Sequence, residues 1–318
     1  MYHRIANPES DVWEITVTPE RFEEQLQVLQ KQKNVVPLLQ LVNDIKSNRL
    51  PKNSIAITFD DGYIDNFTIA KPLLEKYDLP ATFFITSMNI GNEKEFWWDE
   101  LEHLILFTEK LPEVFSFLIN DHQIEIELRP ETILTEDLRQ KHHNWIAGVE
   151  AYPTIRAELF YLVWEQLRLL PYAEEQEQLQ KIRHWAESPT TIRPDYRTMS
   201  AAELKQLATN DLFTIGAHTL THPALASYPV LFQHKELSEN RNILRELTKQ
   251  DVTLLSYPFG NYSDDTIAIT RETGFSAAFT TEEKTIKPAS PKYTLGRFQV
   301  KNITGTKFKS DLKQWGSH

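Results

Sequence analysis

The chain has 318 residues, 41% of them hydrophobic and 11% aromatic, so it can bury the core of one large domain or of one domain carrying a big insertion. Its 45 acidic and 34 basic residues give a net charge of −11, which argues against nucleic acid or an anionic membrane surface as a partner. It contains no cysteine, which excludes disulfides and thiolate catalysis.

The N-terminal segment predicts neither a signal peptide nor a membrane anchor. Met1–Glu20 has no apolar central region, and no run of about 18 apolar residues occurs in the chain. The sequence as given is therefore expected to be cytoplasmic, with no integral membrane segment. Its first residues, Tyr2-His3-Arg4-Ile5, already form a strand-like run, which is compatible with the loss of an upstream segment.

The first chemical motif follows the strand-like run Ser54–Phe59. It reads Thr58-Phe59-Asp60-Asp61-Gly62-Tyr63, so two carboxylates stand side by side where a strand ends. Adjacent carboxylates repel each other, and the pair is tolerable when one binds a cation while the other stays free to move a proton. Taken alone, Asp-Asp-Gly is more often a turn, so a cation site needs ligands from elsewhere in the chain.

After a further strand-like run at Ala81–Thr86, the alternation of strands and helices breaks down between residues 93 and 192. This stretch predicts a helix from Phe96, a strand at Ile124–Leu128 and amphipathic helices at Glu158–Leu170 and Glu174–Trp185. We expect an inserted, mostly helical lid or subdomain at 93–192, with the main domain formed by 1–92 and 193–318.

The additional ligands appear after the run Leu212–Ala217, in His218-Thr219-Leu220-Thr221-His222-Pro223. The two histidines lie four residues apart, so both imidazoles can face one point if the segment turns helically. Two histidines and one carboxylate leave coordination positions open for water on a zinc-like ion, which is typical of catalytic rather than structural sites. A lone His-x-x-x-His is more often a solvated helix face, but here it follows an apolar strand, as the acid pair does.

The remaining elements continue the pattern of repeated β-α units. Ser200 begins a capping box, strand-like runs lie at Val252–Ser256 and Phe275–Thr280, and Ser263 caps a helix that stops at Gly274. Strands separated by helices at this spacing predict an α/β fold. Periodicity alone does not distinguish a barrel from an open doubly wound sheet.

Three segments now stand in a recognisable order: Thr58–Tyr63, His218–Pro223 and Ser256-Tyr257-Pro258-Phe259-Gly260. They resemble the first three motifs of the metal-dependent polysaccharide deacetylases, carbohydrate esterases built on the chitooligosaccharide deacetylase domain. The resemblance covers Met1–Thr86 and Arg197–Trp315, and it implies a distorted (β/α)7 barrel. It also implies a hydrolase that removes N-acetyl groups from an N-acetylated glycan or oligosaccharide.

The resemblance further assigns roles to single residues. It implies that Asp60 is the general base and that Asp61, His218 and His222 hold one divalent metal ion, with zinc as the expected ion. It also implies that the backbone N–H of Phe259 binds the oxyanion.

Two positions depart from the family pattern. Ser256 stands where an arginine commonly holds the base, and no Leu-x-x-His segment near the C-terminus supplies the general acid, since only His234 and His318 follow His222. We predict that Arg297 pairs with Asp60 in place of the missing arginine. We also predict that His3 is the acid, because an imidazole titrates near neutral pH. The alternatives are a surface ion pair for Arg297 and a core histidine for His3.

Tyr63, Trp98 and Asp99 are predicted substrate contacts. Aromatic faces stack on the apolar face of a pyranose, and a carboxylate binds hydroxyls or an amine. The alternative for Trp98 is core packing of an amphipathic helix.

Two other functions are open at this point, and no oligomeric state is predicted. One is an inactive, metal-containing, glycan-binding protein, and the other is a deacylase of a different amide or an ester. The complete set of Asp60, Asp61, His218 and His222 favours an active enzyme, because a binding protein has no need of a second carboxylate.

Overall fold

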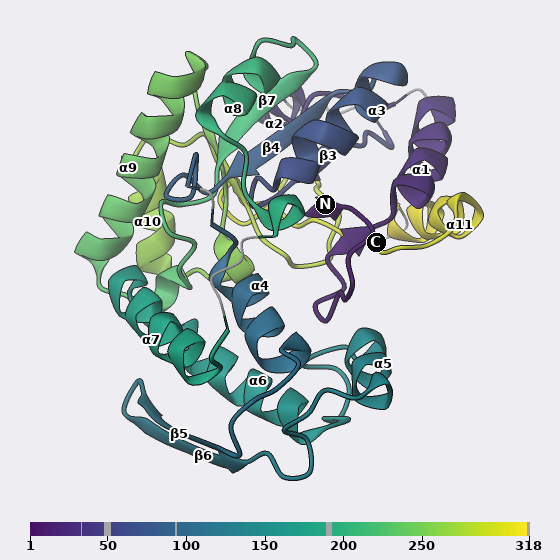
Figure 1. Ribbon diagram of the computed structural model, residues 1–318. Helices are drawn as coiled ribbons and strands as arrows, with labels where there is room; N and C mark the ends of the chain where they lie inside the picture. The colour runs from purple at the N-terminus through teal and green to yellow at the C-terminus, as the bar shows by residue number, and fades with distance from the viewer. Residues whose placement is uncertain (33, 48–51, 93, 189–192, 317–318) are drawn as a thin grey trace. The chain divides into compact units, whose positions relative to one another are not determined.

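The computed structural model describes residues 1–32, 34–47, 52–92, 94–188 and 193–316 (Figure 1). The chain divides into two compact units: the first contains Met1–Asn7, Ile15–Asn92 and Thr198–His318, and the second contains Pro8–Glu14 and Glu93–Arg197. The second unit thus includes the insertion expected at 93–192. It also includes the short segment Pro8–Glu14, which the sequence analysis had assigned to the main domain.

A parallel sheet of five strands forms the centre of the first unit, in the order β3-β4-β7-β8-β9. All but one of the strand residues are buried, so both faces of the sheet are covered, as is usual for a parallel sheet. Every strand falls within a run expected from the sequence: β3 (Ile57–Phe59), β4 (Ala81–Ile85), β7 (Phe213–Ala217), β8 (Leu254–Ser256) and β9 (Ala277–Phe279).

Two further segments extend this sheet at its edges and close it. Tyr2 pairs in parallel with Phe59 of β3, and Leu295 pairs in parallel with Phe279 of β9. The backbone of Met1 then bonds to the segment after Leu295, donating to the Phe298 carbonyl at 2.8 Å and accepting from the Val300 N–H at 2.9 Å. Five strands and two edge segments thus form a closed ring, which confirms the distorted (β/α)7 class.

A row of three aromatic side chains runs across neighbouring strands of the closed sheet, from Tyr2 through Phe59 of β3 to Phe83 of β4. The Tyr2 and Phe59 rings stack with centroids 5.3 Å apart, and the Phe59 and Phe83 rings stack at 4.9 Å. All three side chains are buried. This row fixes the Tyr2 edge segment beside β3, although the backbone pairing there is short.

Helices surround the sheet of the first unit (Figure 1). Both predicted N-caps are present, since Ser200 and Ser263 each accept a hydrogen bond from the third residue of the helix that follows. The remaining elements of this unit are β1 (Arg4–Ile5), β2 (Thr16–Val17), α1 (Pro19–Gln32), α2 (Leu38–Lys46), η1 (Asn66–Ala70), α3 (Lys71–Lys76), α8 (Ala201–Ala208), η4 (Leu225–Ser227), α9 (Val230–Thr248), η5 (Pro258–Gly260), α10 (Asp264–Glu272) and α11 (Gly305–Trp315).

The second unit packs helices beside a two-stranded antiparallel hairpin, β5–β6. Its elements are α4 (Trp97–Glu102), η2 (His103–Phe107), β5 (Val114–Ile119), β6 (His122–Glu127), α5 (Glu136–Asn144), α6 (Ile155–Leu167), α7 (Tyr172–Trp185) and η3 (Pro194–Tyr196). The predicted helices correspond to α4, α6 and α7, and the predicted strand to β6. Helix α5 is not predicted from the sequence, because only Leu138 and His142 of this helix are buried and it has no apolar stripe.

A buried arginine holds the turns of the second unit together. The guanidinium of Arg156, at the start of α6, is fully buried and donates hydrogen bonds to the carbonyls of Ile105, Thr108, Glu131 and Thr132. A guanidinium has five N–H donors, so one side chain can hold four carbonyls of different turns.

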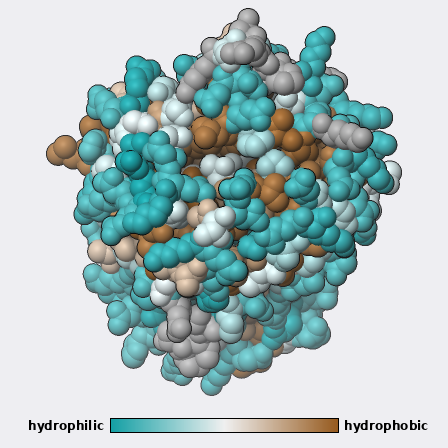
Figure 2. Space-filling model, turned by 90° about the horizontal axis from the view of Figure 1, so that it is seen from above, coloured by the Kyte–Doolittle hydropathy of each residue, from teal (hydrophilic) through white to brown (hydrophobic). Residues whose placement is uncertain are grey.

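Among the described residues, no helix is both long enough and apolar enough to span a membrane. Figure 2 shows a face on which hydrophilic residues predominate, with hydrophobic residues gathered in smaller areas between them.

Candidate metal and catalytic site

Three candidate metal ligands lie together at the carboxyl ends of two strands. Asp61 follows β3, while His218 and His222 follow β7, and parallel strands end at the same edge of the sheet. The Oδ1 atom of Asp61 lies 3.3 Å from His218 Nε2 and 3.4 Å from His222 Nε2. All three side chains are buried, and their donor atoms lie within 4.8 Å of one another. One carboxylate and two imidazoles at this separation fit a divalent metal ion.

The backbone takes up unusual conformations at these ligands. Asp61 has a φ of 74° and His222 a φ of 65°, both in the left-handed region that residues with a Cβ atom rarely adopt. Such conformations are costly and cluster at functional sites. Their presence at two of the three candidate ligands therefore supports a functional role for the cluster.

The segment from His218 to His222 does not form the helical turn that the spacing allowed. The segment is a loop in which Thr219 is also left-handed, with a φ of 63°, and its hydroxyl accepts a hydrogen bond from the His222 N–H at 3.0 Å. This local turn brings the two imidazole centroids to 4.9 Å. The spacing of four residues therefore works through a side-chain-capped turn and not through helical periodicity.

A backbone carbonyl fixes the orientation of His218. Its Nδ1 lies 2.8 Å from the Ser256 carbonyl, so this nitrogen carries the proton, and the Nε2 lone pair is directed at the cluster. A second partner of this kind is usual for a metal-binding histidine.

The two histidines can hold one positive charge between them. Burial lowers the pKa of His218, but Asp61 and Asp60 raise it more, so that it ends above its ordinary value. Burial also lowers the pKa of His222, and the neighbouring His218 lowers it further, so the pKa of His222 ends below its ordinary value. A positive charge beside Asp61 is therefore favoured, as a proton or as a metal ion.

Asp60 lies beside the cluster and is held by a bidentate ion pair. Arg297 Nη1 and Nη2 donate to Asp60 Oδ1 and Oδ2, each at 2.7 Å, which is the pairing predicted from the sequence. Burial raises the pKa of Asp60, but the positive charges of Arg297 and His218 lower it by more than burial raises it, so the pKa falls to about 2. Asp60 is therefore ionised at neutral pH.

Ser256, which occupies the position of the missing arginine, joins this pair. Its hydroxyl accepts a hydrogen bond from Arg297 Nη2 at 2.6 Å and donates one to Asp60 Oδ2 at 3.0 Å. The three side chains are buried and form one network from β8, from the loop after β3 and from the closing segment near Leu295. The sequence shows Ser256 only as a departure from the family pattern and gives no signal of these hydrogen bonds.

His3 lies near both acids in the opening segment. The side-chain amide of Asn66 donates to the His3 carbonyl at 2.7 Å, and His3 Nδ1 is buried with no hydrogen-bond partner in the described part of the chain. Burial lowers the pKa of His3, and the opposing effect of Asp61 and Asp60 does not restore it. The imidazole is therefore neutral at neutral pH.

The other predicted residues differ in their placement. The Phe259 ring lies 4.7 Å from the His222 ring, and its backbone is left-handed with a φ of 56°, so this residue belongs to the site. Tyr63 is fully buried, with the Arg4 guanidinium 4.6 Å from the centre of its ring, and its contact with the substrate stays a prediction. His234 is exposed on α9, and His318 lies outside the described residues.

Trp98 and Asp99 belong to the second unit, where both are buried. The Trp98 ring stacks on Phe96 at 4.4 Å and packs edge-on against Trp97. These contacts favour core packing for Trp98, and the substrate role of the two residues stays a prediction.

A polar face of α9 supports the histidine loop and was missed. Glu236 accepts hydrogen bonds from the Thr221 N–H and hydroxyl, both at 2.8 Å, and Asn240 donates to the Ile85 carbonyl at 3.1 Å. Both are buried, together with Gln233. Polar residues at positions 233, 236 and 240 share one helix face, and this spacing is the signal that could have found them.

Comparisons with known proteins point to one family. The family model described as polysaccharide deacetylase matches residues 47–106 and 171–278, and the unmatched stretch between them lies in the second unit. The chain is 19% identical over 301 residues to the poly-beta-1,6-N-acetyl-D-glucosamine N-deacetylase of Staphylococcus aureus (strain N315), covering 94% of this chain and 72% of that protein. It is 21% identical over 314 residues to YxkH of Bacillus subtilis (strain 168), covering 97% and 73%.

Solved structures share the fold. IcaB from Ammonifex degensii has a TM-score of 0.57 and 16% identity, covering 100% of this chain and 95% of that chain. The Streptococcus pyogenes deacetylase PplD, solved with acetate, has a TM-score of 0.55 and 18% identity, covering 98% and 96%.

Proposed function

Since the family model matches more than half of its residues, the chain belongs to the polysaccharide deacetylase family, and we propose that it is a metal-dependent N-deacetylase of an N-acetylated glycan. One observation carries this proposal: a buried Asp61–His218–His222 ligand set lies beside an ionised carboxylate, Asp60, that is not itself needed as a ligand. The S. aureus relative, named for poly-β-1,6-N-acetylglucosamine, supports a polymer of N-acetylglucosamine as the substrate class.

Asp61, His218 and His222 would hold the ion, and zinc fits two imidazoles and one carboxylate. When bound, such an ion lowers the pKa of water and polarises a carbonyl group. Asp60 would take the proton of the attacking water, because it is ionised and its Oδ1 atom keeps a lone pair beyond the bond from Arg297 Nη1, whereas Oδ2 already accepts from Arg297 Nη2 and Ser256.

Residues on either side of the acetamide would complete the reaction. The backbone N–H of Phe259 would donate to the oxygen of the attacked carbonyl. The carbon–nitrogen bond then breaks, and the sugar amine needs a proton as it leaves. We assign this proton to His3, which can supply it only after receiving the proton that Asp60 removes, because its lowered pKa leaves it neutral beforehand.

The inactive, glycan-binding alternative loses one of its grounds. A chain without an arginine to hold the base would favour that alternative, but here Arg297 makes two hydrogen bonds to Asp60. A buried arginine that orients a carboxylate serves proton transfer more readily than glycan binding.

The decisive experiment measures acetate release. The purified chain is incubated with β-1,6- and β-1,4-linked N-acetylglucosamine oligomers and with an O-acetylated xylan, before and after chelation and after zinc is restored. We expect acetate from an N-acetylated oligomer, its loss on chelation and its recovery with zinc. Acetate from the xylan alone would assign a different deacylase, and metal-loaded protein that releases none would support the binding protein.

Arg297→Lys is expected to lower kcat by about 10-fold or more while the metal content stays unchanged, because a lysine ammonium cannot make two parallel bonds to Asp60. Ser256→Ala should have a smaller effect, since both arginine bonds remain. Arg271→Lys, at an exposed position of α10, is the matched control. An unchanged kcat in Arg297→Lys would show that the pair is structural only.

His3→Gln is expected to lower N-deacetylation by roughly 10- to 100-fold without loss of metal. Hydrolysis of 4-nitrophenyl acetate should be largely spared, because 4-nitrophenolate leaves without a proton. His234→Gln, on the exposed face of α9, is the control. An equal loss on both substrates, or unchanged turnover with an intact alkaline limb of the pH profile, would exclude His3 as the acid.

A further inference from the structure

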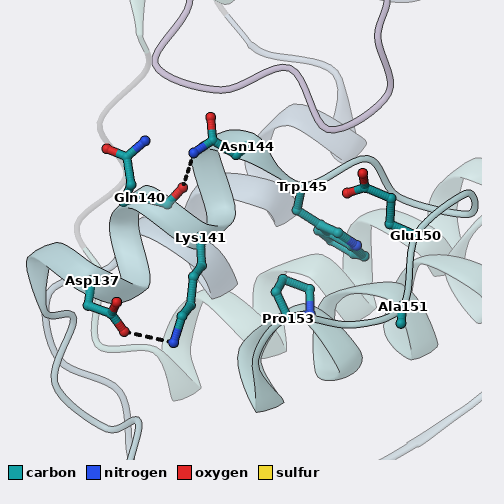
Figure 3. Close-up of a pocket in the computed structure, with 8 residues that line it drawn as sticks. All are labelled: Asp137, Gln140, Lys141, Asn144, Trp145, Glu150, Ala151 and Pro153. Carbon is teal, nitrogen blue, oxygen red and sulfur yellow. Dashed lines mark hydrogen bonds and ion pairs between the residues drawn. The ribbon is translucent and has the colours of Figure 1, made fainter.

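A pocket with a volume of about 300 Å³ lies in the second unit, between α5 and the loop that leads to α6 (Figure 3). Such a volume is at the lower end of the range for small-ligand sites. Four lining residues come from one face of α5, and the others from the loop: Asp137, Gln140, Lys141, Asn144, Trp145, Glu150, Ala151 and Pro153. Figure 3 shows the Trp145 ring between the end of α5 and the loop at Pro153.

The Trp145 side chain provides an unused donor in this lining. It is only 2% exposed, and its Nε1 has no hydrogen-bond partner among the residues that the structure describes. A buried indole N–H normally has one. The unpaired N–H thus belongs to a residue that lines the pocket.

A row of aromatic rings leads away from the pocket. Tyr152 packs against Trp145 at 6.2 Å and is 44% exposed. The row continues from Tyr152 to Tyr161 at 5.6 Å, from Tyr161 to Trp164 at 5.9 Å and from Trp164 to Trp13 at 4.4 Å. The aromatic row consists of Tyr152, Tyr161, Trp164 and Trp13. The last three are partly exposed, so the row is not fully buried in the core.

We propose that the pocket and the aromatic row form a second carbohydrate site, which binds a chain of N-acetylated pyranoses. The residues of this site all belong to the second unit, whereas the metal ligands belong to the first. The choice of N-acetylated sugars rests on the proposed function, and the choice of a glycan rests on the lining itself.

The lining suits sugars better than other polymers. Pyranose rings present an apolar C–H face that stacks on aromatic rings. Their hydroxyl and acetamide groups need donors and acceptors at close spacing, which the amides of Gln140 and Asn144, the carboxylates of Asp137 and Glu150 and the Lys141 ammonium supply. The phosphates of a nucleic acid would be repelled by the carboxylates of the pocket and by those of Glu158 and Glu165 near Tyr152.

The test measures binding in a chain that cannot turn its ligand over. The probe is the β-1,6-linked tetramer of N-acetylglucosamine, titrated calorimetrically into His218→Ala protein. In that background, Tyr152→Ala and Gln140→Ala are each expected to raise the Kd about 10-fold, because each removes a sugar contact from an exposed position. Trp145→Phe should weaken binding with Tm unchanged, since it removes the N–H and keeps the ring.

Leu118→Ala and Gln123→Ala, at exposed positions of the β5–β6 hairpin in the same unit, are the matched controls and should leave the Kd unchanged. The proposal is overturned if the tetramer does not bind to His218→Ala protein, or if Tyr152→Ala and Gln140→Ala bind it as their parent does. The unmutated protein could also release no acetate while binding still depends on Tyr152 and Gln140. That result would support this site and refute only the proposed function. Acetate release without such binding would refute this site alone.

Discussion

Replacing His218 with alanine is expected to remove the bound metal ion and acetate release together. The cluster offers three ligand atoms, and Asp61 Oδ1 lies within 3.4 Å of both imidazole nitrogens, so the loss of one imidazole leaves only two ligands. A catalytic zinc site requires three protein ligands to keep one position open for water. Metal analysis of the unmutated protein should find one ion per chain, and that of His218→Ala close to none.

The control for this experiment is His234→Ala, which removes an exposed imidazole from α9 and should leave metal content and turnover unchanged. The thermal unfolding of the apo proteins shows whether a loss of metal reflects misfolding. A normal metal content in a folded Asp61→Ala, His222→Ala double variant would refute the ligand assignment.

Asp60→Asn is expected to retain the metal and to lose turnover by a factor of roughly 10² to 10⁴, the usual contribution of a general base. Asparagine keeps the shape of the side chain but cannot accept the proton of water. Its amide oxygen, at the Oδ1 position, can still accept from Arg297 Nη1, and its NH₂ group, at the Oδ2 position, can donate to the Ser256 hydroxyl, while the bond from Arg297 Nη2 is lost. Measuring kcat and metal content on the same preparation separates the base from the ligand.

The matched control is Asp265→Asn, at an exposed position in the first turn of α10. Loss of metal in a folded Asp60→Asn protein would mean that the two adjacent acids are assigned in the wrong order. A nearly silent Asp60→Asn would mean that Asp60 only caps the turn after β3.

The strands and helix caps of the first unit could be predicted because their causes are local. Each strand of the sheet is a short apolar run, and Ser200 and Ser263 cap the helices that directly follow them. Helix α5 escaped prediction because it lies in a polar stretch with only two buried residues. Trp98 was ambiguous for a related reason, since an aromatic residue next to polar ones predicts a sugar contact and a core position equally well.

The candidate site divides in the same way. The sequence by itself predicted which side chains would carry the chemistry. Asp60, Asp61, His218 and His222 follow apolar runs in the order of the family's motifs, and Arg297 and His3 were the groups left to fill the missing roles. Only the tertiary structure decided how they meet: Thr219 turns the histidine loop without a helix, Ser256 joins Asp60 to Arg297, and Glu236 supports the loop from α9. The Ser256–Asp60 bond joins residues 196 positions apart and the Arg297–Asp60 pair residues 237 positions apart, so both depend on which strands become neighbours in the closed sheet. Local sequence preferences carry no information about that order.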